Sequence, residues 1–81
     1  MIERIKAVID KWDPIELFPF APKDEYFDES QAIWNGYKNG MGAKELARVI
    51  HQVFSNSFGG NTFAKSIEEC EKIASIIMER L

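Results

Sequence analysis

Apolar residues recur at steps of three and four along most of this chain, and that spacing restricts its possible folds more than any other feature. The N-terminal stripe consists of Ile2, Ile5, Ile9 and Trp12. The central stripe consists of Leu46, Ile50, Val53 and Phe54. The C-terminal stripe consists of Ile67, Cys70, Ala74, Ile77 and Leu81. Because no segment shows the alternation of a half-buried strand, the pattern predicts an all-α protein.

Capping and stop signals place the helix boundaries. We expect helices over residues 1–12, 28–39 and 43–56, and a fourth that begins between 62 and 66 and extends to 81. The pairs Asp28/Gln31 and Ser66/Glu69 have the spacing of a capping box. Glycines at 40 and at 59–60 should end the second and third helices. Gly36 indicates either a close helix contact or a frayed helix end.

A proline-rich connection should join the first two helices. All three prolines lie between residues 14 and 22, where they exclude a regular helix or a central strand. Asp13 and Pro14 fit the N-cap and first position of a short turn, with Ile15 buried below it. The apolar residues of this segment suggest that it packs on the helices.

The length of 81 residues allows one domain, over residues 1–81. Four helices joined by short turns imply a compact antiparallel four-helix domain. Hydrophobic residues make up 46% of the chain and charged residues 28%, a composition typical of folded globular domains. No apolar run is long enough to span a membrane, and the N-terminal residues do not resemble a signal peptide. We therefore expect a cytoplasmic protein that does not bind membranes.

Chemical function is restricted by single copies of reactive residues. With one cysteine, Cys70, and one histidine, His51, the chain can form neither a disulfide nor a Cys/His zinc site. Cys70 is expected in the core and His51 at the surface or a cap. A net charge of −3 argues against nucleic-acid binding. We expect no cofactor, no metal and no enzymatic activity.

Negative charge is concentrated in one segment. Residues 13–29 carry six acidic residues and one lysine, a net charge of −5, whereas the remainder has nine basic and seven acidic residues. This asymmetry favours a protein-binding module that uses an acidic loop to contact a basic protein partner. The candidate partner-binding residues are Asp24, Glu25, Glu29, Tyr26 and Phe20.

Two other interpretations remain open. The carboxylates of this segment can cap the second helix and otherwise be solvated, without a binding role. Alternatively, the chain is a regulatory domain that binds a small molecule in an aromatic-lined pocket near Trp12, Tyr26 and Trp34.

Two short motifs carry a resemblance to a known family. The segments Trp12-Asp13-Pro14-Ile15 and Asp24-Glu25-Tyr26, with a later glycine-bounded helix over 46–59, resemble a family of small bacterial all-helical proteins catalogued as a domain of unknown function and common in Gram-positive spore-formers. The resemblance implies a helical cytoplasmic domain without an assigned activity or cofactor. An immunity-type role is suggested only by analogy with other small acidic proteins. At Phe27 a more regular member often has a polar residue, so that position can be core or surface.

Overall fold

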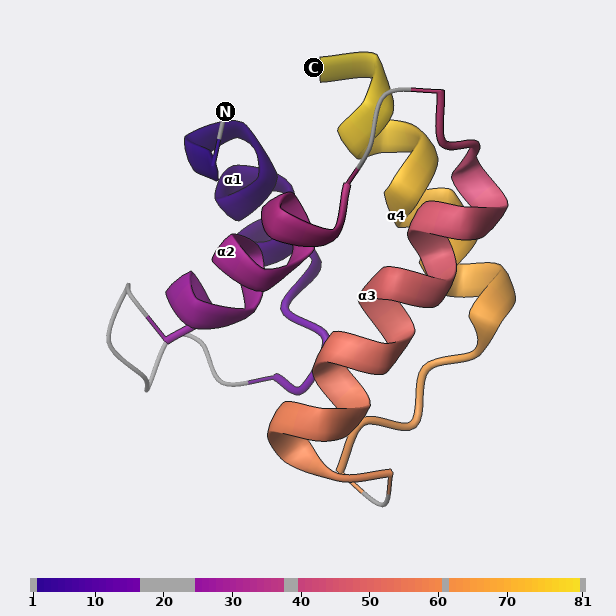
Figure 1. Cartoon of the computed structure of the whole chain (residues 1–81). Helices are drawn as coiled ribbons and strands as arrows, with labels where there is room; N and C mark the ends of the chain where they lie inside the picture. The colour runs from indigo at the N-terminus through magenta and orange to yellow at the C-terminus, as the bar shows by residue number, and fades with distance from the viewer. Residues whose placement is uncertain (1, 17–24, 38–39, 61, 81) are drawn as a thin grey trace.

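The computed structural model describes residues 2–16, 25–37, 40–60 and 62–80, and the regular structure in these segments is helical. The four helices are α1 (Ile2–Trp12), α2 (Phe27–Gly36), α3 (Ala43–Phe58) and α4 (Ile67–Arg80) (Figure 1). The prediction of an all-α four-helix domain is confirmed. Residues 17–24, which hold the remainder of the proline-rich connection, lie outside the described segments.

The helices form a closed ring of four contacts, in which α1 packs on α2 and α4, and α3 packs on α2 and α4. At one end of α1, Arg4 Nη1 donates a hydrogen bond of 2.7 Å to the carbonyl oxygen of Arg80. At the other end, Trp12 Nε1 donates a hydrogen bond of 2.7 Å to Glu69 Oε2. Because these contacts join opposite ends of the two helices, α1 and α4 run in opposite directions, and the N-terminus and C-terminus lie at the same end of the molecule (Figure 1).

The start and end of α2 differ from the sequence prediction. The N-cap residue is Tyr26, its side chain makes no capping hydrogen bond, and the helix begins at Phe27 rather than Asp28. Gln31 Nε2 bonds Asn35 Oδ1 at 3.1 Å, so the predicted Asp28/Gln31 capping box is wrong. The helix ends at Gly36 because Tyr37 adopts an extended backbone with φ −75° and ψ 135°.

The ends of α3 and α4 follow the predicted signals more closely. Gly59 ends α3 with a φ of 83°, a conformation that glycine adopts without steric cost. At the start of α4, the Glu69 backbone N–H donates to Ser66 Oγ at 3.2 Å, which is half of the predicted capping box. The other half is absent because the Glu69 carboxylate accepts from Trp12 instead.

The core lies where the four helices meet. The most buried side chains on α3 are Leu46, Ala47, Ile50 and Phe54, and those on α4 are Cys70, Ile73, Ala74 and Ile77. Phe63, from the loop between these helices, is also buried and stacks on Phe54 with ring centroids 5.2 Å apart. Leu81, the last residue of the predicted stripe, lies outside the described segments.

Gly36 marks a close approach between α2 and α3. A Cβ atom at this position would lie 2.9 Å from Val49 Cγ1. The structure therefore shows a close helix contact at Gly36, and α2 also ends at this residue instead of at the predicted residue 39 before Gly40.

Candidate functional site

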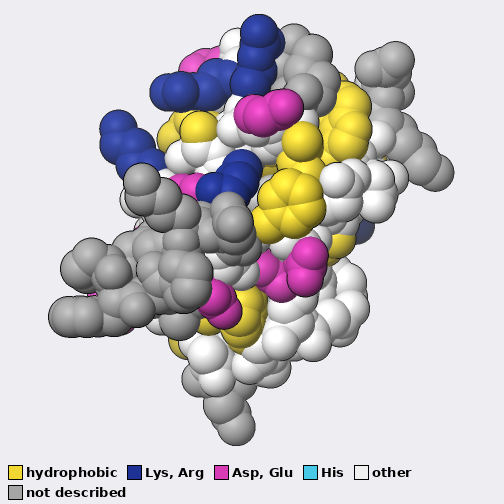
Figure 2. Space-filling model, turned by 90° about the vertical axis from the view of Figure 1, so that its left-hand side faces the viewer, with side chains coloured by type: hydrophobic (Ala, Val, Ile, Leu, Met, Phe, Trp, Pro, Cys, Tyr) yellow, Lys and Arg dark blue, Asp and Glu magenta, His cyan; other side chains and the backbone are white. Residues whose placement is uncertain are grey.

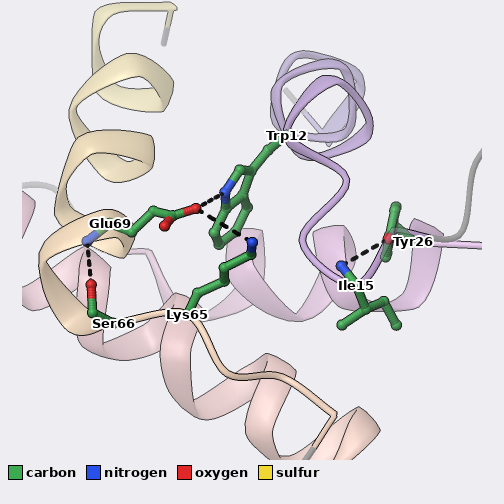
Figure 3. Close-up of polar contacts among 6 residues, drawn as sticks. All are labelled: Trp12, Ile15, Tyr26, Lys65, Ser66 and Glu69. Carbon is green, nitrogen blue, oxygen red and sulfur yellow. Dashed lines mark hydrogen bonds and ion pairs between the residues drawn. The ribbon is translucent and has the colours of Figure 1, made fainter.

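Tyr26, one of the predicted partner-binding residues, is part of the core. Its side chain has no solvent exposure, and its ring packs edge-on against Phe54 and Phe58. Its hydroxyl donates a hydrogen bond of 2.6 Å to Asp13 Oδ1. The same hydroxyl accepts a hydrogen bond of 3.4 Å from the Ile15 backbone N–H (Figure 3). The expectation that Tyr26 faces a partner is corrected, because an aromatic ring beside an apolar helix stripe is more stable when it is buried.

The turn after α1 supplies the acceptor for Tyr26. Asp13 has a φ of 48°, and its carbonyl accepts a hydrogen bond of 3.0 Å from the Glu16 backbone N–H. The predicted turn is therefore present. An N-cap residue has an extended backbone, so the left-handed φ shows that the N-cap role predicted for Asp13 is wrong. Pro14 is buried and Ile15 is half-buried.

A solvent-exposed acidic patch remains at the start of α2. Glu25, Phe27 and Asp28 are exposed, and we call these three residues the acidic face. Phe27 is 44% exposed, which resolves the open question of position 27 in favour of the surface. Figure 2 views the molecule from the side on which α2 lies, where hydrophobic side chains are exposed among Asp and Glu side chains. Two other predicted residues, Asp24 and Phe20, lie outside the described segments.

Glu29 lies next to the acidic face but is largely buried. Its side chain is only 8% exposed, and Glu29 Oε1 is buried without a hydrogen-bond partner among the described residues. Ser30, the following residue, is fully buried, and its Oγ has no partner in the same part of the chain. As a candidate partner-binding residue, Glu29 was expected to be exposed, and the structure corrects that expectation. Its position on the side of α2 that faces the core removes it from water, and a buried unpaired carboxylate oxygen destabilises a fold.

A second surface lies along the seam between α1 and α4. A depression of about 270 Å³ is lined by Ala7, Val8, Lys11, Trp12, Ile73, Ile76 and Arg80. A second depression, of about 420 Å³, is lined by Glu3, Arg4, Ala7 and Arg80. Because they share Ala7 and Arg80, we treat them as one feature, the α1/α4 groove.

Trp12 lines one end of the α1/α4 groove and contacts three side chains there, those of Glu69, Phe54 and Phe63. Its indole N–H donates to Glu69 Oε2, which also lies 4.0 Å from Lys65 Nζ (Figure 3). The Trp12 ring meets Phe54 and Phe63 edge-on, with centroids 5.9 and 6.0 Å apart. These contacts fix the position of the indole within the fold.

Of the three aromatic residues predicted to line a pocket, only Trp12 lines either of the two depressions described above. Trp12 lines the α1/α4 groove, Tyr26 is in the core, and Trp34 stacks on Tyr37 with a centroid distance of 6.0 Å. The sequence reasoning missed the groove. Its available signal was the breadth of the apolar side of α4, where Ile73 and Ile76 extend beyond the main stripe.

The side chains most often used for metal binding or catalysis are not gathered in one site in the described segments. Within the described segments, no group of three or more His, Cys, Asp and Glu side chains is arranged to hold a metal ion. Cys70 is buried. Burial, and to a smaller extent the negative charge of Glu69, raise the pKa of its thiol to about 11. The ring of His51 packs on Phe63 at 5.5 Å, and its Nδ1 lies 3.4 Å from Ser55 Oγ.

A family model described as a domain of unknown function, DUF1871, matches residues 4–79. The chain belongs to this family. The DUF1871 match extends over all four helices, so the family and the fold cover the same part of the chain. The sequence-based resemblance to a domain of unknown function is thereby confirmed. Neither a curated protein nor a solved structure gives a significant match to this DUF1871 chain.

Trp12, Asp13 and Tyr26, from the two short segments singled out in the sequence, make contacts between helices. Asp13 bonds Tyr26, and Trp12 bonds Glu69, so these residues join α1 to the start of α2 and to α4. In the described part of the chain, none of the helices combines the length and the apolar character that crossing a membrane requires.

Proposed function

We propose that this DUF1871 protein is a non-enzymatic, cytoplasmic protein-binding module that presents the acidic face to a basic partner. The observation that carries the proposal is the exposure of Phe27, at 44%, between two exposed carboxylates. A large aromatic side chain supplies apolar contact area, and flanking charges select a partner of opposite sign and increase the association rate.

Glu29 gives independent support to this surface. Within the segments that the structure describes, its Oε1 is buried without a donor, two positions after Phe27 on α2. A Lys or Arg side chain of a partner would supply such a donor if Glu29 adjusts on binding. Residues that weaken a fold without an internal compensation are often retained for function. Glu29 therefore belongs to the proposed interface as a recognition residue rather than as a solvated charge.

The test compares the wild-type protein with a variant of the acidic face. Glu25→Gln combined with Phe27→Ser removes one charge and the aromatic ring. Ile67→Ser combined with Glu68→Gln is the matched control, because these residues are also an exposed apolar and acidic pair at the start of a helix. Each protein is immobilised, and the proteins captured from a native lysate are quantified. A basic protein that the control retains and the acidic-face variant loses would support the proposal. Equal retention by both variants would contradict it.

Glu29→Met separates a recognition role from a structural one. Replacing an unpaired buried carboxylate with an apolar side chain of similar length should raise the free energy of unfolding by about 1–3 kcal/mol. Recovery of the same basic partner should fall in the same variant. A more stable protein that still captures the partner at the wild-type level would exclude Glu29 from the interface.

A further inference from the structure

The α1/α4 groove has the shape of a binding site for an extended or helical segment. On α1 its lining runs from Glu3 to Trp12, a distance of about 13–14 Å at the rise of an α-helix. Its floor is apolar, and Ile76 remains 38% exposed there. Ala7 is exposed, and its small side chain allows another backbone to come close. Such a long, shallow, apolar surface is suited to the apolar side of an amphipathic helix.

The charges around the groove have the opposite sign to those of the acidic face. Lys11 and Arg80 line the first depression, and no acidic side chain lines it. Arg4 and Arg80 line the second, together with one carboxylate, that of Glu3. This cationic rim occurs on a chain with a net charge of −3, so it is a local feature of the surface rather than a result of overall composition.

From this shape and charge, we infer that the α1/α4 groove binds an acidic amphipathic helix of another protein. Carboxylates on both sides of its apolar stripe would pair with Lys11 and Arg80, while its apolar side chains would cover Ile76 and the exposed edge of Trp12. This interaction is independent of the proposed function, because its residues lie on α1 and α4 rather than at the start of α2.

A second copy of this chain fits the groove poorly. Two grooves placed face to face would bring Lys11 and Arg80 close to their own counterparts, and like charges oppose association. The acidic helix of a second copy, α2, offers one exposed large apolar side chain, Phe27, which is not the apolar stripe that would cover the groove. Ile33 of α2 and the N-cap residue Tyr26 are fully buried in its own core.

The inference is tested with a synthetic helical peptide of about four turns, a length at which a side-chain staple is needed to keep an isolated helix folded. It carries leucines at i, i+4 and i+7 flanked by glutamates, and two matched peptides carry glutamine or lysine in place of every glutamate. Calorimetric titration at low and high salt gives each Kd. We expect the glutamate peptide to bind about tenfold more tightly than the glutamine peptide at low salt, and the difference to decrease at high salt.

Variants of the protein locate the contact. Ile76→Glu, and Lys11→Gln combined with Arg80→Gln, should each weaken binding of the glutamate peptide by about tenfold. The matched controls are Ile67→Glu and Lys72→Gln, which change exposed α4 residues that do not line the groove. The controls should bind within about twofold of the wild type. Circular dichroism confirms that each variant is folded.

Four results would overturn the inference. They are no binding of the glutamate peptide, equal binding of all three peptides, loss of binding in the control variants as well as the groove variants, and an alternative occupant. A dimer in sedimentation equilibrium that Ile76→Glu abolishes would identify a second copy as that occupant. Binding to anionic phospholipid vesicles that requires Lys11 and Arg80, without peptide binding, would identify a lipid surface.

Discussion

Tyr26 and Asp13 show how two residues that were expected to act separately can form one structural unit. The hydrogen bond of 2.6 Å between them joins the end of α1 to the start of α2, in a partly buried site. Hydrogen bonds to charged groups contribute about 1.5–3 kcal/mol to stability. At least one carboxylate of the acidic segment, that of Asp13, therefore stabilises the fold, which the charge pattern of the sequence alone does not reveal.

A double-mutant cycle measures this unit. Tyr26→Phe should lower the free energy of unfolding by about 1–2 kcal/mol, because it removes the hydroxyl and keeps the ring. Asp13→Ala should also destabilise the protein. Because each change removes the same bond, the two effects should be non-additive by about 0.5 kcal/mol or more in urea denaturation. Strict additivity would show that the hydrogen bond contributes little.

Cys70 gives a pH-dependent prediction at the residue scale. Its thiol pKa is raised from 9.0 to about 11 in the folded protein. Between these values the unfolded chain releases the thiol proton and the folded protein retains it, so this residue makes the folded state less stable as pH rises through that range. Cys70→Ala should remove this part of the slope. We expect urea midpoints of the wild type to fall more steeply than those of the variant above pH 9, and parallel profiles would contradict the assignment.

At the scale of helices, periodicity proved a better guide than capping signals. The stripes on α1, α3 and α4 predicted which sides are buried, because burial depends on the whole pattern. The exception is Ile67, the first residue of the C-terminal stripe, which is 36% exposed. The start of α2 was predicted from the local pair Asp28/Gln31, yet the helix begins one residue earlier. Burial of the adjacent Tyr26 determines where the chain turns into the helix. Phe63 was missed for a related reason, since an isolated aromatic residue in a loop has no periodic neighbours that indicate burial.

Gly36 provides a test of the contact between α2 and α3. Gly-to-Ala changes inside helices normally stabilise them by about 1 kcal/mol. Here the added Cβ would lie 2.9 Å from Val49 Cγ1, and a β-branched side chain has little freedom to move away. Gly36→Ala should therefore lower the free energy of unfolding by about 1–3 kcal/mol. The double variant Gly36→Ala with Val49→Ala should recover part of that loss relative to Val49→Ala alone. A stabilising effect of Gly36→Ala would show that the helices are less closely packed.

For the whole molecule, the sequence was sufficient to predict the helical class and the buried stripes but not the surfaces. The α1/α4 groove combines Lys11 from one end of the chain with Ile76 and Arg80 from the other. Such a site forms when two helices that are distant in sequence pack together. The periodicity within one helix does not specify which other helix it packs against. The predicted acidic set was affected similarly, because the packing of α2 buried Tyr26 and Glu29 and left Phe27 exposed.

The shared core also makes the whole fold sensitive to one residue. Ile77 on α4 is 1% exposed and belongs to the cluster that all four helices contribute to. Ile77→Ala should lower stability by about 2–5 kcal/mol, a large part of the total for a small domain. Thermal unfolding followed by circular dichroism checks this, and Ile76→Ala is the matched exposed control. A change of similar size in both variants would contradict the core position of Ile77.

The pairing of α1 with α4 has a consequence for how the chain folds. Trp12 and Glu69 are 57 positions apart, and Arg4 and Arg80 are 76 positions apart, so the ring of helices closes only when the first and last helices meet. Contacts of such large sequence separation require a slow search, whereas α3 and α4 are neighbours in sequence and can pair early. Changes at Trp12 or Glu69 should mainly accelerate unfolding, and changes at the α3/α4 contact should slow folding. During synthesis, the apolar stripe of α1 would therefore stay partly exposed until α4 has been made and packs against it.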